Sequence, residues 1–151
     1  MSAALTAEDL AVRREILGAL ARGAQPTRVS VLQALGLDYA AVSASYARLA
    51  EAHVVVLDSG SGEVWMALPF SAVPTDFRVV AGDVPVWANC AWDAFGVAAA
   101  LDRDISFATP CPGSGVVISA GVRHGVAHAN PGTVAHVGVP AARWWDDIGY
   151  T

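Results

Sequence analysis

Two residues that could do chemistry lie three positions apart in the stretch VWANCAWDAFG: Cys90 and Asp93. A thiolate is a strong nucleophile and a good ligand for soft metals. A carboxyl group in an apolar environment keeps its proton to higher pH and can act as a general acid. Positions three apart on a helix share a face, so both side chains could point into one pocket. Both could equally be structural, because cysteine is among the most frequently buried residue types.

The carboxyl group of Asp93 favours a site over plain core. It lies between Trp92 and Phe95, in a segment whose composition looks wholly buried. Burying a lone carboxylate is costly unless it is protonated or paired. We therefore expect a carboxyl group with a raised pKa beside the Cys90 thiol.

Other residues with possible chemistry lie later in the chain. Cys111 is in TPCPGSG, a Pro/Gly turn where a small thiol more often packs than binds metal. His124, His128 and His136 could bind zinc if they converged, but the glycines around them favour a loop, and the zinc-protease glutamate is absent. In a reducing compartment the two cysteines are expected to be free thiols.

Composition limits the class of protein. The chain has 151 residues, of which 54% are hydrophobic and 15% charged, with a formal net charge of -5. No run approaches the roughly 18 apolar residues of a membrane span, and the start does not resemble a secretory signal. We expect a cytoplasmic protein with no membrane partner. The negative charge and the lack of a basic patch argue against nucleic-acid binding.

The elements that would position these residues form two predicted units. Residues 1–73 predict three helices followed by a hairpin that turns at 59–62. The helices are marked by start and stop signals: Thr6 with Asp9, Pro26 with Gly36, and Asp38. This order predicts a winged-helix-like N-terminal module, and its scarcity of cations favours a packing role over DNA binding.

Residues 74–151 predict the second unit, a core around Cys90. Its elements are a connector with one short strand over 74–85, a buried helix over 88–101, a strand, turn and strand over 104–121, and a strand over 133–140. The predicted fold class is therefore α+β. It has a three-helix winged-helix-like module followed by a small mixed, mostly antiparallel β core with a buried helix.

The stretch WANCAWD, Cys111 in CPGSG and the order of the modules resemble the alkylmercury lyase family over almost the whole chain. The resemblance implies protonolysis of carbon–mercury bonds by two thiolates and one aspartate, giving a hydrocarbon and thiol-bound Hg(II) without an organic cofactor. It implies that Cys90 is catalytic and binds mercury, that Asp93 is the catalytic acid, and that Cys111 is a structural thiol. An organomercurial would be the small-molecule partner, and cytosolic thiols or a mercuric reductase would accept the product.

The sequence departs from the family at the second mercury-binding thiolate, because it has no third cysteine. Aligning WWDDIGYT with the family puts that residue one position past Thr151. Three explanations stay open: the sequence is a fragment, the gene continues through a UGA codon read as selenocysteine, or the protein has lost the reaction. We expect the 151-residue chain to bind mercury through fewer thiolates and to turn over poorly. The alternative function is a non-catalytic mercury- or organometal-binding protein or sensor.

Overall fold

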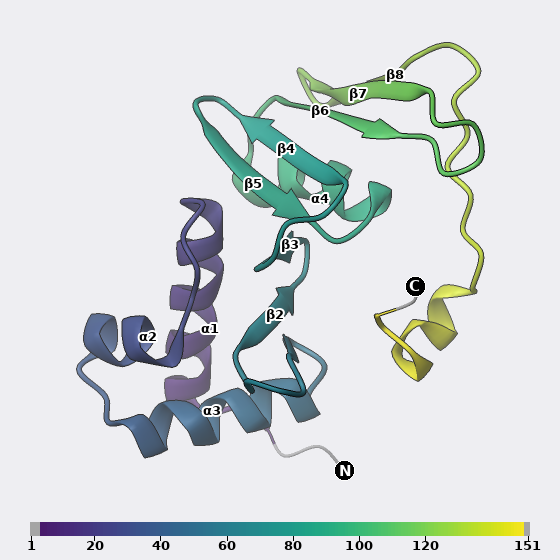
Figure 1. Ribbon diagram of the computed structural model, residues 1–151. Coiled ribbons are helices and arrows are strands. Elements are labelled where there is room, and N and C mark those ends of the chain that lie inside the picture. The colour runs from purple at the N-terminus through teal and green to yellow at the C-terminus, as the bar shows by residue number, and fades with distance from the viewer. Residues whose placement is uncertain (1–3, 150–151) are drawn as a thin grey trace.

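The computed structural model describes residues 4–149, which form helices and one antiparallel sheet (Figure 1). Three helices come first along the chain, then the strands with a fourth helix among them, and a short 3-10 helix ends the described part. The predicted α+β class is confirmed. The winged-helix-like character of the N-terminal part stays a prediction.

The first three helices are α1 (Ala7–Ala21), α2 (Arg28–Leu35) and α3 (Tyr39–Glu51). Two of them begin at their predicted caps, and α2 begins after Thr27, the residue that follows the predicted start signal Pro26. Thr6 and Asp9 form the expected capping box, and the Asp38 carboxylate accepts a hydrogen bond from the Ala41 N–H at 2.7 Å. Gly36 ends α2 in the left-handed region, with φ 67°.

An ion pair between half-buried Arg48 and buried Asp9 joins α1 to α3. Asp9 is fully buried, and Arg48 Nη2 donates to its Oδ1 at 2.7 Å. The Arg48 guanidinium holds the pKa of Asp9 well below its ordinary value. Apolar side chains complete the contact between the helices: Val12, Ile16, Val42, Tyr46 and Leu49 are all fully buried. The three helices therefore share one core.

The strands of the described residues form a single sheet in which every neighbouring pair is antiparallel. The strands are β1 (Val56–Leu57), β2 (Val64–Ala67), β3 (Phe70–Ser71), β4 (Phe77–Ala81), β5 (Val84–Ala88), β6 (Ile105–Pro110), β7 (Val117–Arg123) and β8 (Val126–Ala129). Their order is β1-β2-β3-β5-β4-β6-β7-β8. The predicted hairpin around 59–62 is confirmed as β1 and β2, and the predicted strand, turn and strand as β6 and β7.

Two strand predictions are wrong. The segment 74–85 is not a connector with one strand, because β4 and β5 form a hairpin that turns at Gly82 and Asp83. In both strands the buried residues alternate, which is the pattern of a half-buried sheet. The predicted strand over 133–140 is absent from the described residues, where that segment lacks regular structure and Val134 is 82% exposed. Its apolar residues have no sheet face to cover.

The sheet continues across the predicted boundary at residues 73 and 74. Strands β1 to β3 come from the first predicted unit and β4 to β8 from the second. The junction is the pairing of β3 with β5, where Phe70 faces Ala88. The division into domains 1–73 and 74–151 stays a prediction.

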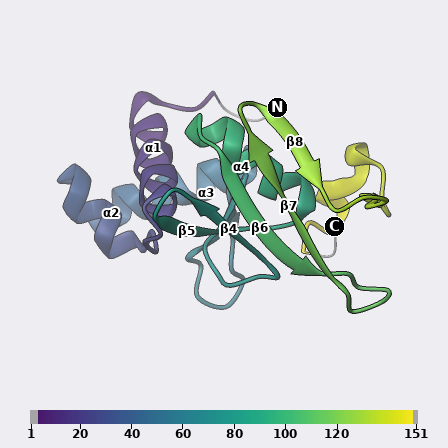
Figure 2. The same ribbon diagram turned by 90° about the horizontal axis from the view of Figure 1, so that it is seen from above.

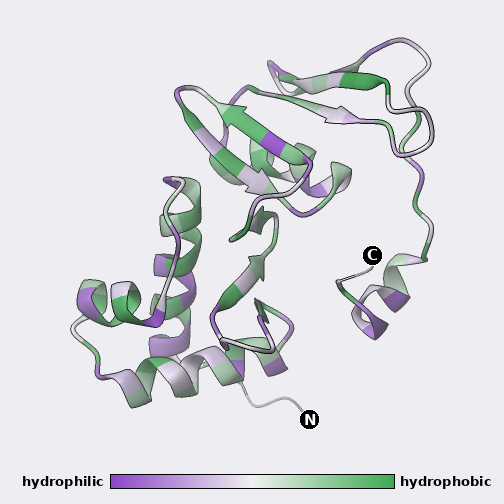
Figure 3. Cartoon of the chain, in the orientation of Figure 1, coloured by the Kyte–Doolittle hydropathy of each residue, from purple (hydrophilic) through white to green (hydrophobic). Residues whose placement is uncertain are grey.

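Helix α4 (Ala91–Leu101) packs against strands β4 to β7 (Figures 1 and 2). Hydrophobic residues fill much of β4 and β5 (Figure 3). The sequence predicted a buried helix here, but burial is confined to one face: Ala94 and Val97 are fully buried, whereas Trp92 is 71% exposed. The fully buried residues of α4 join the same core as β4 and β5.

After β8 the chain returns toward the N-terminal helices and ends in the 3-10 helix η1 (Ala141–Asp146) (Figure 1). Trp145 stacks on His53, with ring centroids 4.1 Å apart and planes within 7°. His53 follows α3 in the left-handed region, with φ 58°. No helix among residues 4–149 is long and apolar enough to cross a membrane.

Candidate active site

Cys90 caps α4 rather than lying within it. Its backbone is extended, and its Sγ accepts a hydrogen bond from the Asp93 N–H at 3.5 Å. Serine, threonine, aspartate and asparagine are the usual residues at this position, so a thiol here is an unusual choice for capping alone. The first turn of a helix favours negative charge, which suits a thiolate.

Asp93 is in the first turn of the same helix, close to the thiol. Burial is the main cause that raises the pKa of its carboxyl group, and hydrogen bonds from Asn89 and Cys90 oppose the rise. Burial also raises the pKa of the Cys90 thiol, and the charge of Asp93 adds to that effect. The pair therefore favours one location of the proton: the Asp93 carboxylate disfavours ionisation of Cys90, and the Cys90 thiol stabilises the ionised form of Asp93.

Asn89 is a third polar residue of the site, and the sequence analysis did not identify it. Its Nδ2 donates to Asp93 Oδ2 at 3.0 Å and to the Phe70 carbonyl oxygen at 3.2 Å. The residue lies between the end of β5 and the cap of α4. It thus connects the β3 backbone to the carboxylate. In the sequence, only the four-residue spacing between Asn89 and Asp93 could have indicated this contact.

The three residues line one cavity of about 290 Å³. The rest of its wall is largely apolar and comes from four places in the chain: Met66 and Leu68 near the end of β2, Phe77 in β4, Trp144 in η1, and Ile148 and Gly149 after it. A cavity of this size is at the small end of the range for ligand sites. It can take a small molecule with an apolar group.

The segment around η1 forms one wall of this cavity, although 133–149 lacks long elements of its own. Trp144 Nε1 donates to the Val139 carbonyl oxygen at 2.8 Å, and the stack of Trp145 on His53 holds the segment to the N-terminal part. The second thiolate that the family resemblance implies, one position past Thr151, lies outside the described residues. Among residues 4–149, Cys90 is the only thiol that lines the cavity.

Cys111 lies in the turn between β6 and β7 and does not line the cavity. Its backbone N–H donates to the Val116 carbonyl oxygen at 2.8 Å, which helps to close the turn. Hydrogen bonding from Ser114 lowers the pKa of its thiol. Both cysteines are free thiols. The structural role of Cys111 stays a prediction, as do the catalytic roles of Cys90 and Asp93.

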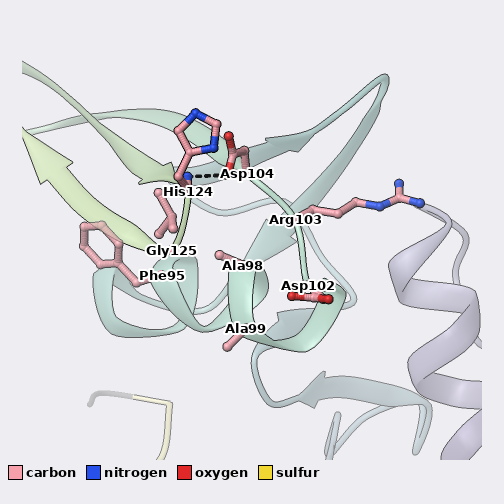
Figure 4. Close-up of a pocket in the computed structure, with 9 residues that line it drawn as sticks. Phe95, Ala98, Ala99, Asp102, Arg103, Asp104, His124 and Gly125 are labelled. Carbon is pink, nitrogen blue, oxygen red and sulfur yellow. Dashed lines mark hydrogen bonds between the residues drawn. The ribbon is translucent and has the colours of Figure 1, made fainter.

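The histidines do not form a metal site within the part of the chain that is described. No group of three His, Cys, Asp or Glu side chains that could hold an ion occurs there. His124 is at the turn between β7 and β8, and its backbone N–H donates to Asp104 Oδ1 at 2.7 Å. Both residues belong to another cavity of about 480 Å³ at the opposite end of α4 (Figure 4). That cavity contains no thiol, so it offers no soft ligand.

Comparison with known proteins identifies a family and a solved structure with a related fold. The family model described as MerB, alkylmercury lyase, matches residues 70–151, just over half of the chain. The chain is also similar to a solved structure described as the mercury-bound form of MerB2, with a TM-score of 0.69 and 24% sequence identity. That likeness covers 85% of this chain and 62% of the other, and it concerns the fold. No curated protein matches the chain.

Proposed function

The chain belongs to the alkylmercury lyase family, and on that premise we propose that it cleaves carbon–mercury bonds by protonolysis. The reaction would convert a small organomercurial into a hydrocarbon and thiol-bound Hg(II). The observation that carries the proposal is the shared cavity of Cys90 and Asp93, where a soft metal ligand lies beside a carboxyl group with a raised pKa.

The first step is capture of the mercury by Cys90. Because its pKa is raised, the thiol holds its proton near neutral pH and must lose it when the sulfur–mercury bond forms. The carboxylate of Asp93 is the nearest base and takes that proton. The S–H bond breaks, the S–Hg bond and an O–H bond form, and the original counter-ligand of mercury leaves as an anion.

The second step is transfer of the same proton from Asp93 to carbon. The electron pair of the carbon–mercury bond goes to the new carbon–hydrogen bond, and the hydrocarbon leaves. Thiolate donation to mercury makes the bound carbon more electron-rich, which favours its protonation. Asp93 returns to the carboxylate, and Hg(II) stays on Cys90. No organic cofactor is needed in this scheme, since the two side chains supply the ligand and the acid.

The apolar wall of the cavity suits the organic group of the substrate. Met66, Phe77 and Trp144 offer apolar contacts to an alkyl or aryl group. Hg(II) prefers a second thiolate after the hydrocarbon has left. We propose that a thiol in solution supplies this second thiolate to the Hg(II) held on Cys90. Cytosolic thiols or a mercuric reductase would then accept the metal. The reducing cytoplasm would keep Cys90 as a thiol.

The test is methane release from methylmercury by stoichiometric protein in the presence of a small thiol. We expect the wild-type chain to release methane, and Cys90→Ser and Asp93→Ala to lose almost all of the release. Cys111→Ser is the matched control and should retain it. Full release from Asp93→Ala would show that another group supplies the proton.

A second candidate is a protein that binds mercury without cleaving the bond. The observation that favours it is the single thiol in the cavity among residues 4–149. Titration with Hg(II) and with methylmercury separates the two functions. Tight binding of both, with intact methylmercury recovered from the complex, would support the binding protein.

A further inference from the structure

Asn89 is held at a fixed place between the sheet and the helix. The residue before it, Ala88, pairs with Phe70 in the register of β3 and β5, and the residue after it caps α4. The side-chain amide reaches back to the Phe70 carbonyl oxygen at 3.2 Å and forward to Asp93 Oδ2 at 3.0 Å. One amide nitrogen thus donates to both the sheet backbone and the carboxyl group.

These contacts fix which way the amide faces. The Phe70 carbonyl can only accept hydrogen bonds, so the amide nitrogen and not its oxygen must face it. A flipped amide would set its oxygen against two acceptors, the Phe70 carbonyl and Asp93 Oδ2. Asp93 Oδ2 therefore always meets a donor.

We propose that Asn89 is a positioning residue for Asp93: its amide keeps Oδ2 as a hydrogen-bond acceptor and leaves Oδ1 to take and deliver the proton. This rests on the proposed function. In a carboxylic acid one oxygen carries the hydrogen and the other accepts. An oxygen that already receives a donor is the better acceptor, so the proton is directed to the other oxygen. Every turnover would then start from the same arrangement.

A second feature of Asn89 agrees with this role. Among the described residues its Oδ1 is buried and has no hydrogen-bond donor. An unpaired buried acceptor costs about 1–3 kcal/mol in stability. Such groups are rare in folded proteins and call for an explanation other than packing. The unpaired Oδ1 of Asn89 is explained if the site requires the amide nitrogen, which donates to Asp93.

The test measures the Asp93 carboxyl group directly, in the full substrate-free chain, by carbon-13 NMR titration. Asn89→Leu removes the amide at similar volume, and Asn89→Asp replaces it with a group of the same shape that has no hydrogen-bond donor when ionised. Both should shift the titration midpoint of Asp93 upward, and Asn89→Asp more so, because two carboxylates would then face each other. Thr75→Val is the matched control: it removes the hydrogen bond from Thr75 Oγ1 to the Ala88 carbonyl oxygen, 2.6 Å long, without touching Asp93.

Single-turnover methane release provides the second readout. Loss of one hydrogen bond to a charged group predicts about a ten-fold slower release in Asn89→Leu, with a pH profile displaced upward. Thr75→Val should keep the wild-type profile. A midpoint for Asp93 that stays at its wild-type value in both Asn89 variants would overturn the inference. Because the NMR titration needs no substrate, it is independent of the proposed function, which fails separately if the wild-type chain releases no methane.

Discussion

Replacing Asp93 with asparagine should make the Cys90 thiol easier to deprotonate. The charge of the carboxylate and its hydrogen bond with the thiol both raise the pKa of Cys90, in addition to the larger effect of burial. Two unit charges about 4 Å apart repel by about 1 kcal/mol in water and by about 4 kcal/mol at the dielectric of a protein surface. Both groups are half-buried, so the repulsion lies between the two values, and the value in water gives its lower limit. That limit corresponds to about a five-fold larger thiolate population.

The assay is the rate of Cys90 alkylation by iodoacetamide, measured in a Cys111→Ser background. That background is necessary because Cys111 is a second free thiol with a lowered pKa and would react first. Well below the thiol pKa, Asp93→Asn should raise the rate by at least about five-fold. At high pH, where the thiol is ionised in either protein, the two rates should converge. If the two rates converge, the substitution has changed the pKa of Cys90. If they stay apart, it has changed the access of iodoacetamide to the sulfur.

Asp102→Asn is the control with the same loss of charge on the same helix. Asp102 ends α4 in the left-handed region, with φ 50°, a conformation that asparagine also tolerates. The Asp102→Asn variant should leave the alkylation rate of Cys90 unchanged. An Asp93→Asn rate equal to that of the parent protein across the pH range would refute the argument that the carboxylate acts on the thiol.

Three further outcomes are expected. In the unmodified chain, mass spectrometry after brief alkylation should find Cys111 labelled before Cys90, because the pKa of Cys111 is lowered and that of Cys90 is raised; the reverse order would contradict the assigned environments. Asp9→Ala should lower the free energy of unfolding, measured by urea denaturation, by about 2–4 kcal/mol. Glu15→Ala, which breaks the exposed pair of Glu15 with Arg22, should lower it by less than about 0.5 kcal/mol. Because folding holds the pKa of Asp9 below its ordinary value of 3.8, its contribution is present above that pH and declines as the pH falls further. Trp145→Ala removes the stack on His53 and should speed alkylation of Cys90 at every pH, by loosening one wall of the cavity; an unchanged rate would show that η1 stays closed without it.

Local signals predicted the parts of the fold that depend on neighbouring residues. The capping box of Thr6 and Asp9 and the cap at Asp38 mark helix starts through hydrogen bonds three residues apart, which are visible in sequence. The hairpin of β1 and β2 and the pair of β6 and β7 also follow from short turns. These elements were predicted because their causes are local.

The parts that were missed depend on contacts distant in sequence. The segment that forms β4 and β5 was predicted to be a connector with one short strand. Its place at the centre of the sheet depends on pairing with β3 and β6, which local signals do not show. The role of Asn89 depends on a carbonyl group at Phe70, 19 residues away. Cys90 was expected within the helix, but it is the cap, and this difference places its sulfur on the Asp93 N–H. The position of Trp144 in the cavity wall could not be predicted from spacing, because the segment between β8 and η1 has no regular structure that would fix its path.

The central claim is that a proton from the protein replaces mercury on carbon. The most direct measurement is a single turnover of methylmercury in D₂O, with the headspace methane analysed by mass spectrometry for the wild-type chain and for Asp93→Asn. The account predicts that the wild-type chain releases about one monodeuterated methane per protein molecule, and that Asp93→Asn releases almost none. Recovery of intact methylmercury from the wild-type complex, or equal monodeuterated methane from both proteins, would contradict it.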